Sequence, residues 1–349
     1  MEVKKTPLDI ALEDHRSKDL PWVCFSLPHQ NEVKLVLQST QELIYADDQS
    51  TGFLVAPFDN ASQKPLLFRP DAQWDARRSL LGDVTKPIQQ MALSKSARKD
   101  HEARVEQALQ AINAQALTKV VLARSIECEG AYDPWLLFRR MLHTYPAAMV
   151  AIWSHPKVGM WLCATPERLL RTSKQLMETV ALAGTSSVSS LEEVVWGEKE
   201  IQEQRWVTQD LDNSLRSLGL SPVIHPLQTI QAGPLFHLAQ TITAERDGID
   251  LDKLISVLHP SPAIAGWPRA AALKMIKSLE TEDRAFYAGY LGWIDAGNQA
   301  DLYVTLRCLS WKNDRVKLYV GGGIVAGSNP GLEWEETQAK ARVLAQLIG

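Results

Sequence analysis

The feature of this sequence that most constrains its fold is the C-terminal stretch 302–344, which alternates like two strands and then becomes periodic like a helix. Tyr303, Thr305 and Arg307 fall on one face of a first predicted strand, and a turn is expected at 312–314. The second strand leads into three consecutive glycines, where a ligand can approach backbone N–H groups closely. These glycines are Gly321, Gly322 and Gly323.

A helix is predicted after these strands, because Pro330 stands just before a run with acidic residues in its first turn. Glu333, Glu336 and Lys340 lie at i, i+3 and i+7 and therefore share one face of this helix. Together with Arg307 they predict a pocket for a small carboxylate and a divalent metal. Periodicity alone leaves an alternative equally open, namely a surface helix with ordinary charge pairs after a glycine-rich turn.

Composition restricts the class of protein. A chain of 349 residues exceeds the usual size of a single core, so one large domain or two closely joined domains are expected. The hydrophobic content of 45% and the charged content of 22% are ordinary for a soluble globular protein. A net charge of −4 without a Lys/Arg run gives no reason to expect a nucleic-acid partner.

No apolar run approaches the ~20 residues that a membrane span needs, and residues 1–19 contain no apolar stretch long enough for a signal peptide. The sequence therefore predicts a cytoplasmic protein with no membrane partner. The cysteines are far apart in apolar runs, which predicts reduced core residues and not a disulfide framework or a zinc site. They are Cys24, Cys128, Cys163 and Cys308.

Along the chain, residues 1–95 are predicted to be a β-rich region without a chemical motif, and 96–349 to be the catalytic part of one domain spanning 1–349. Helices are predicted at about 94–116, 134–145 and 191–218, and on both sides of a proline-rich break at 259–268. Lys119 begins a predicted strand. Glu167 follows a proline and interrupts another strand that is otherwise apolar, and Glu203 lies on the long helix 191–218.

Five ionisable residues lie in segments that are otherwise apolar or structured, where a charge is costly unless it is paired or binds a metal. Carboxylates without His or Cys neighbours suit Mg²⁺. A buried lysine with a lowered pKa can act as a base, and a glutamate with a raised pKa can act as an acid. This combination predicts addition or elimination on a small polycarboxylate. The residues are Lys119, Glu167, Glu203, Arg307 and Glu336.

Motifs for other chemistry are absent from the sequence. There is no G-x-G-x-x-G, no Walker A, no G-x-S-x-G and no zinc-ligand spacing. Nicotinamide-dependent, ATP-dependent and serine-hydrolase activities therefore have little support.

At these same residues the chain resembles the chorismate-utilising enzymes, the family of isochorismate, salicylate, anthranilate and aminodeoxychorismate synthases. The order and spacing of the matching stretches agree with the family over about residues 100–349. The stretches are TKVVLAR (118–124), ATPERLLR (164–171), ALAGT (181–185), GEKEIQEQ (197–204), LFHLAQT (235–241), HPSPAIAGWPR (259–269), FYAGYLGWID (286–295), VTLRC (304–308), GGGIVAGS (321–328) and EWEETQAK (333–340).

The resemblance implies an α/β fold of the α+β type, with large antiparallel β-sheets packed face to face and helices outside. It implies that Lys119 activates water and that Glu167 is the general acid. Glu203 and Glu336 would hold Mg²⁺, with Glu333 close by through water. The substrate-binding residues implied by the resemblance are Gly184, Thr185, His237, Ala263, Arg307, Gly321, Gly322, Gly323 and Lys340.

Within the family, the resemblance is closest to the isochorismate synthases, which implies Mg²⁺-dependent, reversible conversion of chorismate to isochorismate. Ala263 stands where the ammonia-using members and the salicylate synthases resemble one another in carrying threonine, which favours water as the nucleophile. The alternatives are a salicylate synthase, which also eliminates pyruvate, and a chorismate-binding protein without turnover. The resemblance implies a monomer. Whether a menaquinone or a siderophore pathway consumes the product stays open.

Overall fold

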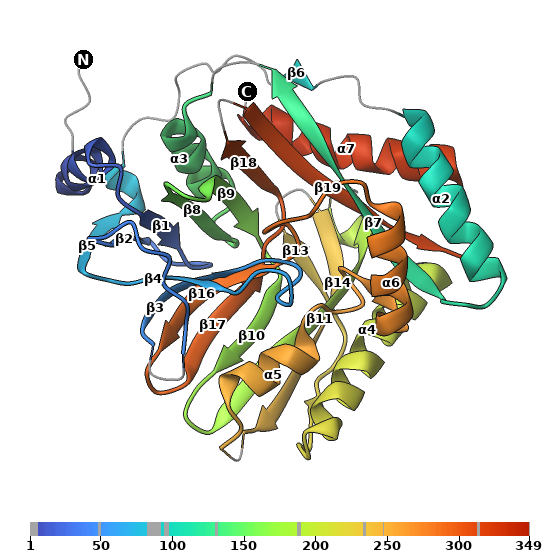
Figure 1. Cartoon of the computed structure of the whole chain (residues 1–349). Helices are drawn as coiled ribbons and strands as arrows, with labels where there is room; N and C mark the ends of the chain where they lie inside the picture. Colours follow the sequence, from blue (N-terminus) through green and yellow to red (C-terminus); the bar gives the residue numbers. More distant parts are fainter. Residues whose placement is uncertain are drawn as a thin grey trace.

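The computed structural model describes residues 6–47, 50–81, 92–93, 98–129, 132–186, 190–232, 235–246, 248–312 and 315–348. Two large antiparallel sheets dominate the fold (Figure 1). Helices lie around them, which confirms the predicted arrangement.

The first sheet has ten strands, all paired antiparallel. Its order is β15 (Gly266–Trp267), β7 (Lys119–Glu129), β19 (Arg315–Val325), β18 (Cys308–Lys312), β9 (Gly159–Thr165), β8 (Met149–His155), β1 (Trp22–Ser26), β2 (Glu32–Leu37) and β5 (Ala72–Arg77), with β6 (Ala92–Leu93) beside β7.

The second sheet has nine strands, also antiparallel. Its order is β12 (Val223–Ile224), β14 (Leu235–Glu245), β11 (Leu176–Ser186), β10 (Arg168–Thr172), β17 (Gln299–Val304), β16 (Tyr290–Asp295), β3 (Gly52–Ala56) and β4 (Leu66–Phe68), with β13 (Gln228–Ala232) beside β14.

The helices of the described chain are α1 (Pro7–Ser17), α2 (Arg98–Asn113), α3 (Pro134–Thr144), α4 (Glu198–Ser217), α5 (Leu251–Leu258), α6 (Arg269–Leu279) and α7 (Pro330–Ile348), with short 3₁₀ turns at Arg78–Leu80 and Leu191–Glu193. Apolar side chains of α1, α3 and α7 form one buried cluster with strands of the first sheet. A larger cluster joins the two sheets and includes α2, α4, α5 and α6. In Figure 1, α2 and α7 lie side by side, and α4 packs on β11 and β14.

Two predictions about secondary structure need correction. The helix predicted over 191–218 is a short turn followed by α4, because the chain is extended at Val194 and Gly197 before the helix begins. The N-terminal region, predicted to be β-rich, begins with α1. Its signal is in the sequence: Pro7 opens the helix, and Thr6 and Asp9 form a capping box at its N-terminus.

The predictions for Lys119, for the last helix and for the cysteines are confirmed. Lys119 is the first residue of β7, and α7 begins at Pro330. All four cysteines are buried and free of disulfides. Among the described residues, no helix combines the length and apolarity that crossing a bilayer requires. Residues 94–97 of the predicted helix 94–116, and residues 313–314 of the predicted turn 312–314, lie outside the described part of the chain.

Candidate active site

The site lies where the chain passes twice between the two sheets. The predicted strand containing Glu167 is two strands, because β9 belongs to the first sheet and β10 to the second. The strand predicted to carry Arg307 is likewise divided, since β17 lies in the second sheet and β18 in the first. Glu167 and Arg307 therefore lie at crossings and not within strands.

The two crossings are hydrogen-bonded to each other. The Val304 N–H donates to the Glu167 carbonyl at 2.9 Å, and the Ala164 N–H donates to the Arg307 carbonyl at 3.3 Å. Arg307 has φ +48°, a left-handed conformation that is uncommon for a residue with a Cβ. This backbone arrangement brings the segment of Glu167, the predicted acid, next to that of Arg307, a predicted substrate-binding residue, although the two are far apart in sequence.

Glu167 is 8% exposed. Burial raises the pKa of its carboxyl group to about 7, and the nearby charge of Lys119 only partly opposes this rise. A carboxyl group in this environment can hold a proton near neutral pH and donate it. This is the property that a general acid requires.

Lys119 is 5% exposed, and its Nζ lies 3.7 Å from Oε2 of Glu203 on α4. Burial lowers the pKa of the ammonium group and Lys340 lowers it further, whereas Glu203 and Glu167 raise it. The net effect is a lowered pKa, so Lys119 becomes neutral at a lower pH than an exposed lysine does. Lys119 and Glu167 thus have pKa values displaced toward each other, as an acid–base pair requires.

The three glycines lie within β19, which continues to Val325, and not at a strand end as predicted. A Cβ on Gly323 would stand 3.0 Å from Cε of Lys119, and one on Gly321 would stand 2.9 Å from the hydroxyl of Tyr287. Gly322 faces α7 instead, near Glu333. Two of the glycines therefore leave room for buried side chains of the site.

The predicted face of α7 is oriented toward β19. Lys340 Nζ donates to the Gly321 carbonyl at 3.0 Å and also forms an ion pair with Glu336 at 2.8 Å. The alternative interpretation, a helix with ordinary charge pairs, is thus correct for Glu336 and Lys340. Lys340 nevertheless also contacts the strand that carries the glycines. Burial acts to raise the pKa of Glu336, but Lys340, Lys199 and Lys119 outweigh it and lower the pKa.

Glu333 is buried on the same helix, and its Oε2 has no hydrogen-bond partner. Burial raises the pKa of this carboxyl group, while the Ser328 hydroxyl opposes the rise. An unsatisfied buried carboxylate oxygen is costly, and it suits a position that a cation or an ordered water would contact. Among the described residues, no three His, Cys, Asp or Glu side chains converge closely enough to hold a metal by themselves.

His237 on β14 is bonded to the irregular part of β11 that contains Gly184, where the pairing register with β14 shifts. Its Nδ1 donates to the Gly184 carbonyl at 2.8 Å, which leaves the proton of the neutral ring on Nδ1. Burial, with smaller contributions from Arg307 and Lys340, lowers the pKa of His237 to about 4 although the bond to Gly184 opposes the change, so the ring is neutral at pH 7. Gly184 has φ +69°, and Thr185 follows it in β11.

The structure also places the remaining two predicted residues. The guanidinium of Arg307 lies over the ring of Tyr145, 5.6 Å from its centroid, and burial lowers its pKa. Ala263 is half-buried against the larger core cluster in the turn before β15. Because Trp267 of β15 pairs with Lys119, this turn leads directly to the strand that carries the predicted base. The role of Ala263 in choosing the nucleophile stays a prediction.

Two features of the site were missed by reasoning from the sequence. The phenol of Tyr287 lies against Gly321, and its pKa is raised by burial and, in part, by the charge of Glu167. A cavity of 620 Å³ opens beside Glu203 and is lined in part by Trp206 and Lys199. Tyr287 belongs to the matching stretch FYAGYLGWID (286–295), so the resemblance could have indicated it as a site residue. Nothing in the sequence indicated the cavity.

Comparison with known proteins is consistent with this geometry. Residues 64–349 match the family described as chorismate binding enzyme. Isochorismate synthase EntC of Escherichia coli K12 is 29% identical over 294 residues, which covers 80% of this chain and 74% of EntC. Isochorismate synthase MenF of Haemophilus influenzae is 32% identical over 260 residues, covering 70% of this chain and 59% of that protein.

A solved structure extends the fold comparison. The structure of MenF, the menaquinone-specific isochorismate synthase of Escherichia coli, has a TM-score of 0.81 and covers 94% of this chain and 89% of its own. At 22% identity this likeness establishes the fold. The two sheets and their crossings thus define a protein with the fold of the chorismate-utilising enzymes. The match over residues 64–349 shows that the chain belongs to the family of chorismate binding enzymes.

Proposed function

We propose that this protein is an isochorismate synthase that interconverts chorismate and isochorismate. The observation that carries the proposal is the pairing of two buried groups, Lys119 with a lowered pKa and Glu167 with a pKa of about 7. The names of the relatives support the choice of reaction. They include menaquinone-specific and other isochorismate synthases, so the proposal concerns their shared reaction.

In the proposed reaction, neutral Lys119 takes a proton from water as the water oxygen attacks C2 of chorismate. The ring double bonds shift, the bond from C4 to its hydroxyl breaks, and Glu167 gives its proton to the departing oxygen, so that water leaves. One water enters and one leaves, which balances an isomerisation. Protonated Lys119 and ionised Glu167 are then placed to perform the reverse reaction, which suits a reversible enzyme.

Substrate orientation is assigned to the groups around this pair. Arg307 and Lys340 supply positive charge for the two carboxylates of chorismate, and backbone N–H groups near Gly321, Gly322 and Gly323 add donors. His237, a neutral imidazole bonded to the Gly184 carbonyl, would line the pocket for the substrate ring. Gly184 and Thr185 would close over the substrate, and Ala263 leaves space for water at the nucleophile's position.

Magnesium fits the carboxylates of this site. Glu203 on α4 raises the pKa of Lys119, and Lys119 in turn lowers the pKa of Glu336 on α7. The buried Oε2 of Glu333 has no hydrogen-bond partner. Oxygen-only ligands from few side chains suit Mg²⁺, which keeps several waters. Glu203 and Glu336 would hold the ion, with Glu333 reached through water. The bound ion would supply positive charge for the ring carboxylate.

Removing either proposed metal ligand is expected to weaken magnesium binding. For Glu203→Gln and Glu336→Gln, the Mg²⁺ concentration giving half-maximal turnover should rise roughly 10- to 100-fold, because each variant loses one charged ligand. The increase in melting temperature that Mg²⁺ gives the wild type should also disappear. Glu335→Gln is the matched control, since Glu335 lies on α7 but pairs with Arg98 and Arg342. Unchanged magnesium dependence in both variants would contradict the ligand assignment.

The reaction itself is tested by incubating the purified protein with chorismate and Mg²⁺ and resolving the products by chromatography. Isochorismate, together with an equilibrium reached from either side, is the expected result. Salicylate and pyruvate would identify a salicylate synthase instead. Tight chorismate binding without any product would identify a binding protein without turnover.

Two further aspects belong to this proposal. We infer that residues 1–349 fold as one domain, with 1–95 as its N-terminal part. This is supported by a buried cluster that contains residues of β1 and β3 together with residues of β7, β17 and β19. A monomeric state is implied by the family resemblance, and a cytoplasmic location is predicted from the sequence; both stay predictions.

A further inference from the structure

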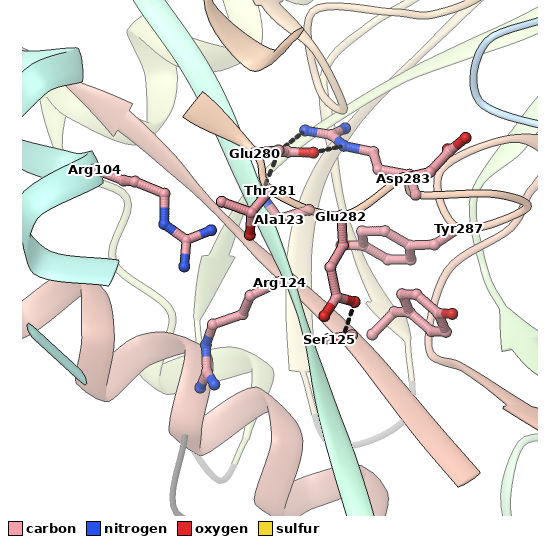
Figure 2. Close-up of a pocket in the computed structure, with 11 residues that line it drawn as sticks. Arg104, Ala123, Arg124, Ser125, Glu280, Thr281, Glu282, Asp283 and Tyr287 are labelled. Carbon is pink, nitrogen blue, oxygen red and sulfur yellow. Dashed lines mark hydrogen bonds and ion pairs between the residues drawn. The ribbon is translucent and has the colours of Figure 1, made fainter. Parts of the chain in front are cut away.

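A buried ion pair lies behind the strand that carries Lys119. Glu280, at the end of α6, and Arg284 line a small pocket of 70 Å³ beside β7. Figure 2 shows the carboxylate of Glu280 reaching the backbone of Ala123, to which it is joined by a hydrogen bond of 2.7 Å. This pocket is separate in its lining from the cavity beside Glu203.

Arg284 is 4% exposed, and its guanidinium contacts three segments of the chain. Nε and Nη2 donate to the two carboxylate oxygens of Glu280 at 2.8 and 2.6 Å. Nη2 also donates to the Val121 carbonyl at 2.7 Å, and Nη1 donates to the Ile264 carbonyl at 2.9 Å. The planar fork of arginine can make this set of bonds, whereas the point charge of lysine cannot.

The ion pair provides hydrogen-bond partners for part of one edge of β7 where no neighbouring strand does so. On this edge, β15 pairs with Lys119 and Val120, and β6 pairs with Cys128 and Glu129. No strand of the described chain pairs with this edge between them. The Val121 carbonyl and the Ala123 N–H there are instead satisfied by Arg284 and Glu280. Buried backbone groups require such partners, so the side chains replace a missing strand.

The segments joined in this way all carry residues of the site. Val121 follows Lys119 by two residues, and Ile264 follows Ala263 directly. Arg284 also accepts, at its own carbonyl, the N–H of Tyr287 at 2.9 Å. One guanidinium therefore links the strand of the proposed base to the turn of the proposed nucleophile-selecting residue. The backbone of the same residue is bonded to the tyrosine beside Gly321.

We propose that the side chain of Arg284, oriented by Glu280, is a positioning group that fixes the strand of Lys119 relative to the Ala263 turn. It does not reach the substrate or the reacting atoms. The assignment rests on the proposed function for its kinetic consequences, while its structural consequence can be measured without any substrate.

The test uses Arg284→Ala in the full-length protein. Loss of alignment at the reacting atoms should lower kcat about 100-fold while KM for chorismate changes less than about threefold, because a displacement of about 1 Å can cost that much. Guanidinium ion at millimolar concentration should raise the kcat of this variant at least about tenfold, since the ion can enter the enlarged pocket. Hydrogen exchange measured by mass spectrometry should show faster exchange in peptides covering Val121 and Ala123.

Arg246→Ala is the matched control. Arg246 is also 4% exposed and also donates to backbone carbonyls, those of Ser173, Asn298 and Ile249. These lie in turns and loops that carry none of the proposed site residues. The Arg246→Ala variant should lose stability but keep kcat, and guanidinium should not change its turnover.

Arg284→Lys provides the test if Arg284→Ala does not fold. The variant keeps the charge but loses the fork, so kcat should fall about tenfold with KM nearly unchanged. A kcat equal to that of Arg246→Ala, or no rescue together with unchanged exchange at Val121 and Ala123, would overturn the proposal. If the wild-type protein makes no isochorismate, the proposed function is refuted. The positioning role is still tested in that case, because the hydrogen-exchange measurement needs no substrate.

Discussion

Replacing Lys119 with methionine is expected to lower kcat for chorismate isomerisation by roughly 1,000-fold or more, the upper range for loss of a positioned base. Methionine has a similar length and fills the same buried space, but it cannot accept a proton. Binding of the substrate depends mainly on other groups, so KM should change little. Steady-state kinetics with chorismate, measured at saturating Mg²⁺, gives both constants.

The same substitution should not destabilise the protein. Burial lowers the pKa of Lys119 in the folded state, so the folded chain binds this proton less tightly than the unfolded chain. The resulting cost is fully present below the folded-state pKa and disappears as the pH rises through the unfolded value of 10.5. Lys119→Met removes that cost at neutral pH, so its melting temperature should equal or exceed that of the wild type.

Lys317→Met is the control for Lys119→Met. Lys317 lies on β19 in the same sheet but pairs with Glu282 at the surface, at 3.0 Å. Loss of this exposed pair should cost less than about 1 kcal/mol and leave kcat unchanged. If Lys119→Met kept more than a tenth of wild-type turnover, another group would have to be the base.

The sequence predicted the separate elements of the site better than their arrangement. Lys119 and Glu167 could be singled out because each is a charge within an apolar strand pattern, and such a charge needs a reason. The helix face with Glu333, Glu336 and Lys340 followed from a helical spacing. These inferences depend on residues close together in the chain, where periodicity is informative.

The crossings between sheets could not be predicted in this way. The sequence is strand-like on both sides of each crossing, apolar in β9 and β10 and alternating in β17 and β18, so the pattern does not show that the chain changes sheets. Which sheet a strand joins depends on pairing with strands far away in sequence. The ion pair of Glu280 and Arg284 has the same character, because two side chains of one segment satisfy the backbone groups of Val121, Ala123 and Ile264, which are far away in sequence.

Converting Glu167 to glutamine gives the most informative pair of changes, one in the pH dependence of activity and one in stability. The active form of the wild type requires neutral Lys119 and protonated Glu167. Its kcat/KM should therefore rise as the pair loses a first proton and fall as it loses a second, which gives a bell-shaped profile. Glutamine cannot donate this proton, so kcat should drop roughly 100- to 10,000-fold, and the residual activity should lack the descending limb.

The stability of Glu167→Gln should change in the opposite direction. Because the folded-state pKa of Glu167 is about 7 against an ordinary 4.5, the folded chain binds this proton more tightly than the unfolded chain. Wild-type stability therefore falls as the pH rises between these two values, and above them the buried carboxylate costs about 3 kcal/mol. Glutamine carries no charge to bury. The variant should match the wild type near the ordinary carboxyl pKa and be more stable than it above neutral pH.

Urea unfolding at an acidic and at an alkaline pH measures this difference directly. A gain in the free energy of unfolding that appears only at the higher pH, together with lost turnover, would identify Glu167 as a carboxyl group that is kept protonated for catalysis at the expense of stability. Glu178→Gln is a suitable control, because Glu178 lies on β11 and pairs with Arg168 at 3.1 Å outside the proposed acid–base pair. If Glu167→Gln were less stable than the wild type at alkaline pH, the carboxylate must be stabilised in the folded state, and Glu167 could not be the proton donor.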